Sequence, residues 1–459
     1  MEEAVLPHSG RRARRAKEPV PPAARRAAVA GGVGTFIEYY DYMLFSVLTV
    51  YIAPLFFPAS DPSVSVLAGL AVYGAGFVAK PVGALVFGRL GDRRGRRSTL
   101  LLTVVLMGVT TSLIAVLPTY AAIGVAAPVL LMVLRVLQGA SSGAELQGAV
   151  TYVLESAPKS RRAGLASMVN LGVGLGGASG ALTAAIIGLT VSPQTMLAWG
   201  WRVPFLVAIP LTVLAFVVRR RLEDTPEFEE LVERRQIARS PIKDTFVAHR
   251  RILLVAILVG LGYSMFGGLV GWLVPYLTGI RRLDPAPIFL AYALGMAVGN
   301  LVVPLTGALT DRFGHRRMIV GLLAVSLVLM VPVLAILGSA VSPVLLGVAM
   351  TVLIGLSAAG GPPVYTYIAE LFPVSARFTG ANIGNQIAAA VGGGTAPLVA
   401  SALVLTLASP FAPLLLLALA TVIGASSVLM APRFLAGTQS PLYRDASAGD
   451  PDVPVTAAR

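Results

Sequence analysis

Apolar stretches long enough to cross a bilayer recur along almost the whole sequence. Hydrophobic residues make up 56% of the 459 residues, charged residues only 13%, and the mean hydropathy is +0.79. A soluble fold with this composition has too few polar residues to cover its surface, and a helix needs about 20 apolar residues to cross the hydrocarbon core. We therefore predict an all-α membrane protein with twelve transmembrane helices, at about 28–52, 66–88, 98–118, 121–147, 165–190, 201–219, 252–279, 286–309, 317–338, 342–367, 379–407 and 412–432.

Basic residues are concentrated in alternate loops between these helices. The N-terminal tail carries seven and the segment 219–251 carries nine, whereas the loops near 53–65, 118–122, 189–198, 339–343 and 408–412 carry none. By the positive-inside rule, both termini and the central segment are expected on the cytoplasmic side of the cell membrane. Only Arg281 and Arg282 break the pattern. The net charge of +14 therefore indicates membrane topology, and no nucleic-acid partner is expected.

The longest polar interval divides the helices six and six. We predict a basic tail at 1–27, an N-terminal bundle at 28–219, a linker at 220–251, a C-terminal bundle at 252–432 and a disordered cytoplasmic tail at 433–459. Within the linker, the segment 222–235 is predicted to form a short surface helix that begins at Thr225-Pro226.

Two short motifs repeat between the halves. Gly88-Arg-Leu-Gly-Asp92 after the second helix matches Gly307-Ala-Leu-Thr-Asp311 after the eighth, at an offset of 219 residues. Glu155-x-x-Pro-x-x-x-Arg162 matches Glu370-x-x-Pro-x-x-x-Arg377 at an offset of 215. Related six-helix halves are a transporter architecture.

With these motifs the sequence resembles the major facilitator superfamily, and within it the metabolite-proton symporters. The loop from Gly88 to Arg97 carries the superfamily signature, and Gly34–Tyr42, Arg135–Gly139, Trp199–Phe205 and Glu370–Pro373 are similar to the symporter family. The resemblance covers about 28–430 and departs from the family pattern at Gly143–Gly148. It implies proton-coupled transport of organic acids, amino-acid osmolytes or shikimate-like compounds.

The charged turns are predicted to act as a gate. An Asp among several Arg in a glycine-punctuated turn indicates a network that locks the halves together in one state; the alternative is a simple positive-inside anchor. The predicted gating residues are Gly88, Asp92, Arg93, Gly95, Arg96, Arg97, Glu155, Arg162, Asp311, Arg312, Glu370 and Arg377.

Charges inside spans need a partner or a function, because each costs about 2.5 to 3.5 kcal/mol on insertion scales. Glu38 and Asp41 lie three residues apart on one helix face, so either is a candidate for the coupled proton. Arg135, or alternatively Lys80, is the candidate partner of a substrate carboxylate. The competing interpretation is a static ion-pair network between helices one, two and four.

The remaining predicted substrate contacts are polar residues inside the spans. With Arg135 and Lys80, the set comprises Tyr42, Gln138, Glu145, Asn170, Tyr263, Asn300, Tyr365 and Asn385. Glu145 is alternatively a gate residue.

Other features of the sequence argue against an enzyme active site, a metal site or a cofactor site. No span contains His and the chain has no Cys, so a hydrolase or metal site is not expected, and neither is a cofactor. Gly172, Gly176 and Gly180 are predicted to form a close-packing helix face rather than a dinucleotide loop. We therefore predict a monomeric secondary transporter that takes up a small carboxylate-bearing or zwitterionic metabolite with protons; an exporter or antiporter is the alternative.

Overall fold

Six spans make up the first half of the protein. The structure is a computed structural model that describes residues 19–58, 62–236, 240–339 and 342–444. The spans are α1 (Pro22–Phe56), α2 (Pro62–Arg94), α3 (Arg96–Val116), α5 (Ala126–Ser142) continued by α6 (Glu145–Ser156), α7 (Arg162–Thr190) and α9 (Arg202–Arg220). Short helices α4 (Tyr120–Ile123) and α8 (Pro193–Thr195) lie in the loops.

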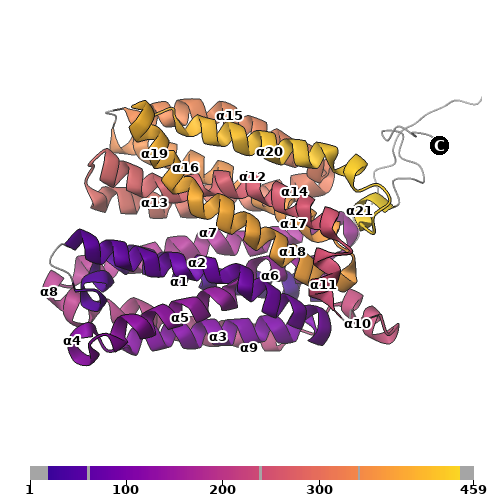
Figure 1. Cartoon of the computed structure of the whole chain (residues 1–459), viewed down its shortest axis with the longest axis horizontal. Coiled ribbons are helices and arrows are strands. Elements are labelled where there is room, and N and C mark those ends of the chain that lie inside the picture. Colours follow the sequence, from indigo (N-terminus) through magenta and orange to yellow (C-terminus); the bar gives the residue numbers. More distant parts are fainter. Residues whose placement is uncertain (1–18, 59–61, 237–239, 340–341, 445–459) are drawn as a thin grey trace, which may run out of the picture.

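Six further spans make up the second half. They are α12 (Arg250–Val274), α13 (Pro285–Gly299) continued by α14 (Val303–Phe313), α15 (His315–Gly338), α16 (Pro343–Ala359) continued by α17 (Gly361–Leu371), α18 (Val374–Ala388) continued by α19 (Gly394–Leu407), and α20 (Pro413–Phe434). The halves lie side by side with their helices roughly parallel to one long axis (Figure 1).

The predicted twelve-helix fold is confirmed. Ten of the spans in the described part of the chain are long and apolar enough to cross a membrane by length and composition. The other two are α1 and α2, which are 35 and 33 residues long and carry Glu38, Asp41 and Lys80. Several helices extend beyond the predicted spans, as where α6 continues to Ser156, because hydropathy detects only the apolar part of a helix whose backbone bonds continue into the polar region.

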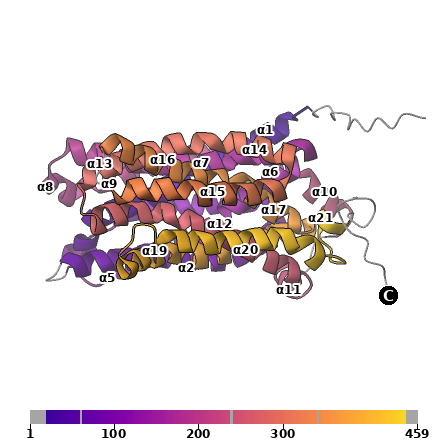
Figure 2. The ribbon, with the colours of Figure 1, turned by 90° about the horizontal axis from the view of Figure 1, so that it is seen from above.

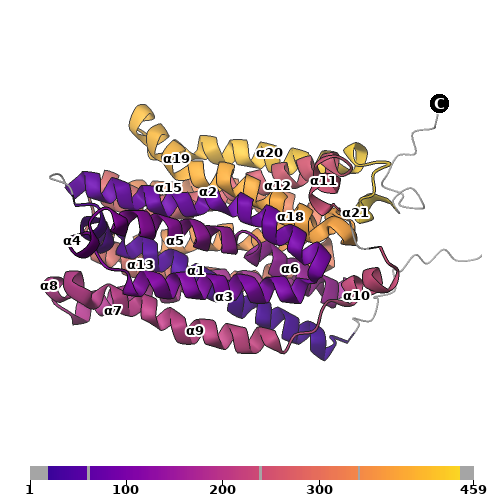
Figure 3. The ribbon, with the colours of Figure 1, turned by 60° about the horizontal axis from the view of Figure 1, so that its bottom comes forward.

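The linker contributes two helices that touch both halves. α10 (Pro226–Glu233) packs against α6 and α18, and α11 (Pro241–Phe246) packs against α2, α12 and α18. α10, α11 and α21 (Pro441–Arg444) lie at one end of the molecule, opposite α4 and α8 (Figures 2 and 3). We call this the linker end.

The predicted linker helix is present, but it is shorter and less exposed than expected. Thr225 caps α10 by accepting a bond from the Phe228 N–H at 3.3 Å. Phe228 is buried because one face of this amphipathic helix packs between the halves.

The glycine face predicted on α7 is confirmed. A Cβ atom on Gly172, Gly176 or Gly180 would collide with the backbone carbonyl oxygens of Gly32, Phe36 and Tyr40, respectively. The absence of side chains at these positions lets α7 lie directly on α1. This contact fixes the part of α1 that carries Glu38 and Asp41.

A second close contact joins α2 to α5. A Cβ on Gly139 would meet the Gly76 carbonyl, and one on Gly143 would meet the carbonyl of Lys80. The turn of α2 that carries Lys80 therefore packs directly against α5. It immediately precedes Pro81, where a helix is expected to kink.

One of the two basic residues that break the loop-charge pattern has a structural partner. Arg281 donates to the Leu337 carbonyl at 3.0 Å and to the Ser339 carbonyl at 3.1 Å, at the C-terminus of α15. A cation there satisfies carbonyl groups that the helix leaves unpaired.

Parts of both predicted tails are helical. α1 begins at Pro22 within the predicted tail 1–27, and residues 433–444 contain the end of α20 and α21. The basic residues Arg11, Arg12, Arg14, Arg15 and Lys17, and residues 445–459, lie outside the described residues.

Candidate functional site

A buried ion pair joins α1 to α2. The Lys80 Nζ lies 3.2 Å from Glu38 Oε1, and the two side chains are 9% and 1% exposed. The second carboxylate oxygen, Glu38 Oε2, is buried with no hydrogen-bond partner in the described part of the chain. A buried acceptor left unpaired is costly, so this carboxyl group is suited to taking up a proton or a ligand.

Aromatic rings surround the ammonium group of this pair. The Lys80 Nζ lies 4.1 Å from the centre of the Tyr42 ring, 5.1 Å from Phe77 and 6.0 Å from Tyr39. These cation–π contacts stabilise the charge away from water. We call Glu38, Tyr39, Tyr42, Phe77 and Lys80 the Lys80 site.

The Lys80 site faces the second half of the protein. Tyr39 lies within electrostatic reach of Tyr263 on α12, and Tyr365 on α17 lies within reach of Tyr39 and Glu38. Tyr263 and Tyr365 pack edge to face at 5.4 Å. Two predicted substrate residues of the second half, Tyr263 and Tyr365, therefore lie close to Tyr39 and to the predicted proton carrier Glu38.

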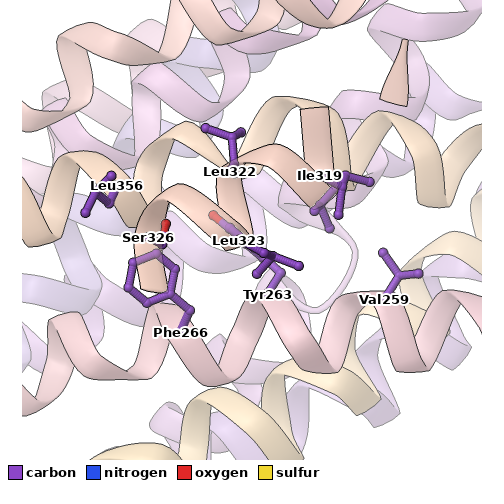
Figure 4. Close-up of a pocket in the computed structure, with 10 residues that line it drawn as sticks. Val259, Tyr263, Phe266, Ile319, Leu322, Leu323, Ser326 and Leu356 are labelled. Carbon is purple, nitrogen blue, oxygen red and sulfur yellow. The ribbon is translucent and has the colours of Figure 1, made fainter. Parts of the chain in front are cut away.

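Tyr263 also borders a small apolar cavity inside the second half. Residues of α12, α15, α16 and α17 line this cavity, including Phe266, Ser326 and Leu356 (Figure 4). None of the described residues that line this cavity is charged.

A second buried pair is more completely satisfied. Arg135 lies 3.4 Å from Asp41 Oδ2, and Thr111 donates to Asp41 Oδ1 at 3.0 Å. Gln138 donates to Asp41 and accepts from Arg135, and the Arg135 guanidinium lies 4.0 Å from the Phe45 ring centre. With the Lys80–Glu38 pair, this cluster joins the first, second and fourth spans, as the alternative of an ion-pair network expects, and all of its members belong to the first half.

Glu145 forms a separate ion pair that lies within electrostatic reach of Glu38. It pairs with Arg219 of α9 and accepts from Thr103 at 2.8 Å. Arg219 also donates to the carbonyls of Ala30 and Leu100, at 3.3 and 2.9 Å. Arg219 does not stand out in the sequence, because its position at the end of a span is also that of an ordinary interfacial cation.

Two of the three predicted asparagines lie at the contact between the halves. Asn300 packs on Gly174 of α7, and the Asn170 Oδ1 lies near Gly361 of α17. Asn385 is buried on α18, whose Gln386 donates to the Gly143 carbonyl at 3.1 Å.

At the linker end the two repeated aspartates make reciprocal contacts. Asp92 accepts from the backbone N–H groups of Phe378 and Thr379, at 3.3 and 2.8 Å. Asp311 accepts from those of Ala163 and Gly164, both at 2.8 Å. Each aspartate therefore binds the N-terminal part of a helix in the other half, where the helix dipole favours an anion.

The repeated Glu and Arg residues also pair across the halves. Glu155 lies 3.4 Å from Arg377, and Glu370 lies 3.4 Å from Arg162. Arg96 connects the first pair to the aspartate, at 3.1 Å from Glu155 and 3.1 Å from Asp92.

The linker adds a residue that was not among the predicted gating residues. Glu227 of α10 pairs with Arg162 at 2.6 Å and also with Arg377, so it bridges the two halves. We call the set Asp92, Arg96, Glu155, Arg162, Glu227, Asp311, Glu370 and Arg377 the linker-end gate.

The other five predicted gating residues have different surroundings. Gly88 allows α2 to approach Thr379, and Gly95 has a φ of 104°, a conformation that favours glycine. Arg93 and Arg312 are exposed, and Arg97 donates to the Arg220 carbonyl at 2.8 Å within the first half.

The ion pairs and hydrogen bonds of the linker-end gate lie toward one end of the interface between the halves, which α7 also forms with α13 and α14. α18 lies against α2 near that end, and its continuation α19 diverges from α2 toward the other (Figure 1). The fold and this site define a multi-pass membrane transporter rather than an enzyme.

Comparison with known proteins agrees with this class. A family model for the Major Facilitator Superfamily matches residues 32–392. The chain is 34% identical to the shikimate transporter of Escherichia coli (strain K12) over 395 residues, which cover 83% of this chain and 88% of that protein. It is 31% identical to the citrate-proton symporter of Klebsiella pneumoniae, with the same two coverages.

The fold matches a solved transporter structure. The proton:xylose symporter XylE bound to 6-bromo-6-deoxy-D-glucose superposes with a TM-score of 0.74 at 14% identity, covering 90% of this chain and 96% of that one. The chain belongs to the Major Facilitator Superfamily and, within it, to the metabolite-proton symporters.

Proposed function

We propose that this protein imports a small carboxylate-bearing or zwitterionic metabolite together with a proton, by alternating access. The observation that carries the proposal is the Lys80–Glu38 pair, which faces the second half and leaves Glu38 Oε2 without a partner among the described residues. Similarity to a shikimate transporter and a citrate-proton symporter supports a carboxylate as substrate.

Charge balance at Lys80 supplies the coupling. Protonation of Glu38 removes the counter-charge of a buried ammonium, and an uncompensated buried charge costs roughly 3 to 5 kcal/mol. A substrate carboxylate that pairs with Lys80 restores the balance. Proton and substrate therefore favour each other's binding, and by linkage the effect is reciprocal.

Lys80 is a better candidate than Arg135 for the substrate's carboxylate. Arg135 is already engaged by Asp41, Gln138 and Phe45 within the first half. The Lys80 site lies within electrostatic reach of Tyr263 in the second half. Asp41 then stabilises Arg135, and Glu38 takes the proton.

The linker-end gate supplies the alternation. Its cross-half pairs hold the halves together at the linker end, and their release would open the Lys80 site to that side. The distribution of basic loops supports a cytoplasmic position for this end, for the linker and for both termini in the cell membrane. We propose that a single chain is the transporting unit, because the site is formed by the two halves of one chain.

Uptake by purified protein in liposomes tests the proposal. Radiolabelled shikimate, citrate, proline and glycine betaine are offered separately, with and without an inward proton gradient. We expect gradient-driven accumulation of at least one, which an uncoupler abolishes. Loss of preloaded compound driven by the same inward gradient would instead indicate an antiporter, and gradient-independent equilibration would contradict proton coupling.

A further inference from the structure

At one of the positions where the two copies of the gate motif differ, a different basic side chain stands in each half. Arg96 follows Asp92 by four residues, and His315 follows Asp311 by four. Arg96 lies beside Glu155 in the first copy, and the His315 Nδ1 lies 3.8 Å from Glu370 Oε2 in the second. A permanently charged guanidinium in one half is therefore matched by an imidazole in the other, and imidazole titrates near neutral pH.

A threonine fixes which imidazole nitrogen faces the carboxylate. The Thr366 hydroxyl donates to the Pro362 carbonyl, so its oxygen is left to accept from His315 Nε2, which lies 3.0 Å away. In the neutral ring this places the proton on Nε2 and turns the lone pair of Nδ1 toward Glu370. Proton uptake at Nδ1 replaces a repulsive contact with an attractive one.

The same carboxylate is the cross-half partner of Arg162. Glu370 lies 3.4 Å from Arg162 of the first half, whereas His315 and Glu370 both belong to the second. A protonated His315 competes with Arg162 for Glu370 and repels it. When the gate opens, Arg162 moves away from Glu370, whereas His315 belongs to the same half as Glu370 and stays beside it. The protonated imidazole then keeps its attraction to Glu370 and loses its repulsion from Arg162, so proton binding favours the open state.

We propose that His315 makes the linker-end gate sensitive to pH, with protonation weakening the Arg162–Glu370 pair and releasing the two halves at this end.

Only some of the ionisable groups at this end of the protein act on the His315 ring. Glu370 and Arg162 are the two charges in electrostatic reach of its ring. Asp311 of α14 accepts from α7, and Tyr367 of α17 bonds to Tyr443 of α21 at 2.8 Å. The remaining ionisable groups at this end of α14, α15 and α20 are exposed: Arg312, Arg316, Arg317 and Arg433.

Gate opening can be measured without any substrate. Because the chain has no cysteine, Ser98→Cys and Ala436→Cys introduce a unique pair of spin labels. Both positions are exposed at the linker end, one in each half. Pulsed electron–electron distance measurements then give the closed and open fractions at about pH 6 and about pH 8, on either side of the ordinary histidine range.

Two variants serve as matched controls. In the unmodified gate, we expect the closed-to-open ratio to fall roughly threefold from about pH 8 to about pH 6, as for a partly exposed ion pair. His315→Gln should stay closed at both values, and His315→Arg should be shifted toward open at both. A pH-independent distance in the unmodified gate, or a pH response retained in His315→Gln, would overturn the proposal.

The gate response can be separated from proton-coupled transport. In a Glu38→Gln background, the distance change at the linker end should persist, because His315 has no contact with Glu38 in the described structure. Loss of the response in that background would assign it to Glu38 instead of His315.

Discussion

Asp92 and Asp311, 219 residues apart, make the same contact in opposite directions: each accepts two backbone N–H groups near the N-terminus of a helix in the other half. The four amide donors are themselves 215 residues apart, because Ala163 matches Phe378 and Gly164 matches Thr379. The internal repeat therefore gives the gate contacts an approximate two-fold symmetry. Both aspartates stabilise the same state of the protein, in which the halves are joined at the linker end.

Replacing one of these aspartates should open the linker end. Hydrogen bonds to a charged group contribute about 1.5–3 kcal/mol each, so Asp92→Asn should lower the closed-to-open ratio by about tenfold or more. We expect slower uptake in liposomes with substrate binding nearly unchanged. Arg89→Gln, an exposed position on the same helix, is the control and should transport normally. Unchanged flux in Asp92→Asn would refute the gate assignment.

Asp311→Asn provides an independent test of the two-fold relation. Its two bonds are as short as the shorter bond of Asp92, so the variant should slow uptake to a similar extent. If Asp311→Asn transports at the unmodified rate while Asp92→Asn does not, the gate depends on the first copy alone. Uptake and the spin-label distance are measured on the same preparations.

The α1–α7 contact should not tolerate a methyl group. Gly176→Ala places a Cβ against the Phe36 carbonyl, and over-packing of this kind costs typically 1–3 kcal/mol. We expect lower thermal stability and weaker substrate binding, because α1 carries Glu38. Gly188→Ala on the same helix is the matched control, since nothing lies within 4 Å of its added Cβ. Equal melting temperatures for the two variants would exclude the close-packing role.

The Glu145–Arg219 pair should be a structural element of the first half. Arg219→Met leaves a buried carboxylate without its cation, a change that typically costs about 3–5 kcal/mol. Adding Glu145→Gln should recover much of this loss. A double-mutant cycle by chemical denaturation of detergent-solubilised protein measures the coupling. Independent, additive effects would show that the two side chains do not stabilise each other.

Much of the fold could be predicted because lipid imposes simple rules. Hydropathy locates the spans, and the four-residue spacing of Gly172, Gly176 and Gly180 predicts a helix contact. Thr225-Pro226 likewise predicts the start of α10. Each of these signals is local, so one sequence is sufficient to detect it.

The partners of the charged residues could be predicted only in part. The repeat indicates that Glu155, Arg162, Glu370 and Arg377 act in a gate, but the crossed pairing depends on how the halves are placed. The linker carboxylate of Glu227 and the aromatic side chain of Phe77 have no distinguishing sequence context. Their roles follow from contacts between segments far apart in the chain.

Proton uptake on substrate binding tests the central claim most directly. A transported compound is added to the purified protein in weakly buffered detergent solution, and proton release or uptake is followed with a pH-sensitive dye. Because the substrate's carboxylate takes Lys80 from Glu38, the unmodified protein should take up close to one proton per substrate bound at a pH where free Glu38 is ionised. Glu38→Gln should bind the compound with no proton uptake. Binding to the unmodified protein without proton uptake, or equal uptake in Glu38→Gln, would contradict the proposed coupling.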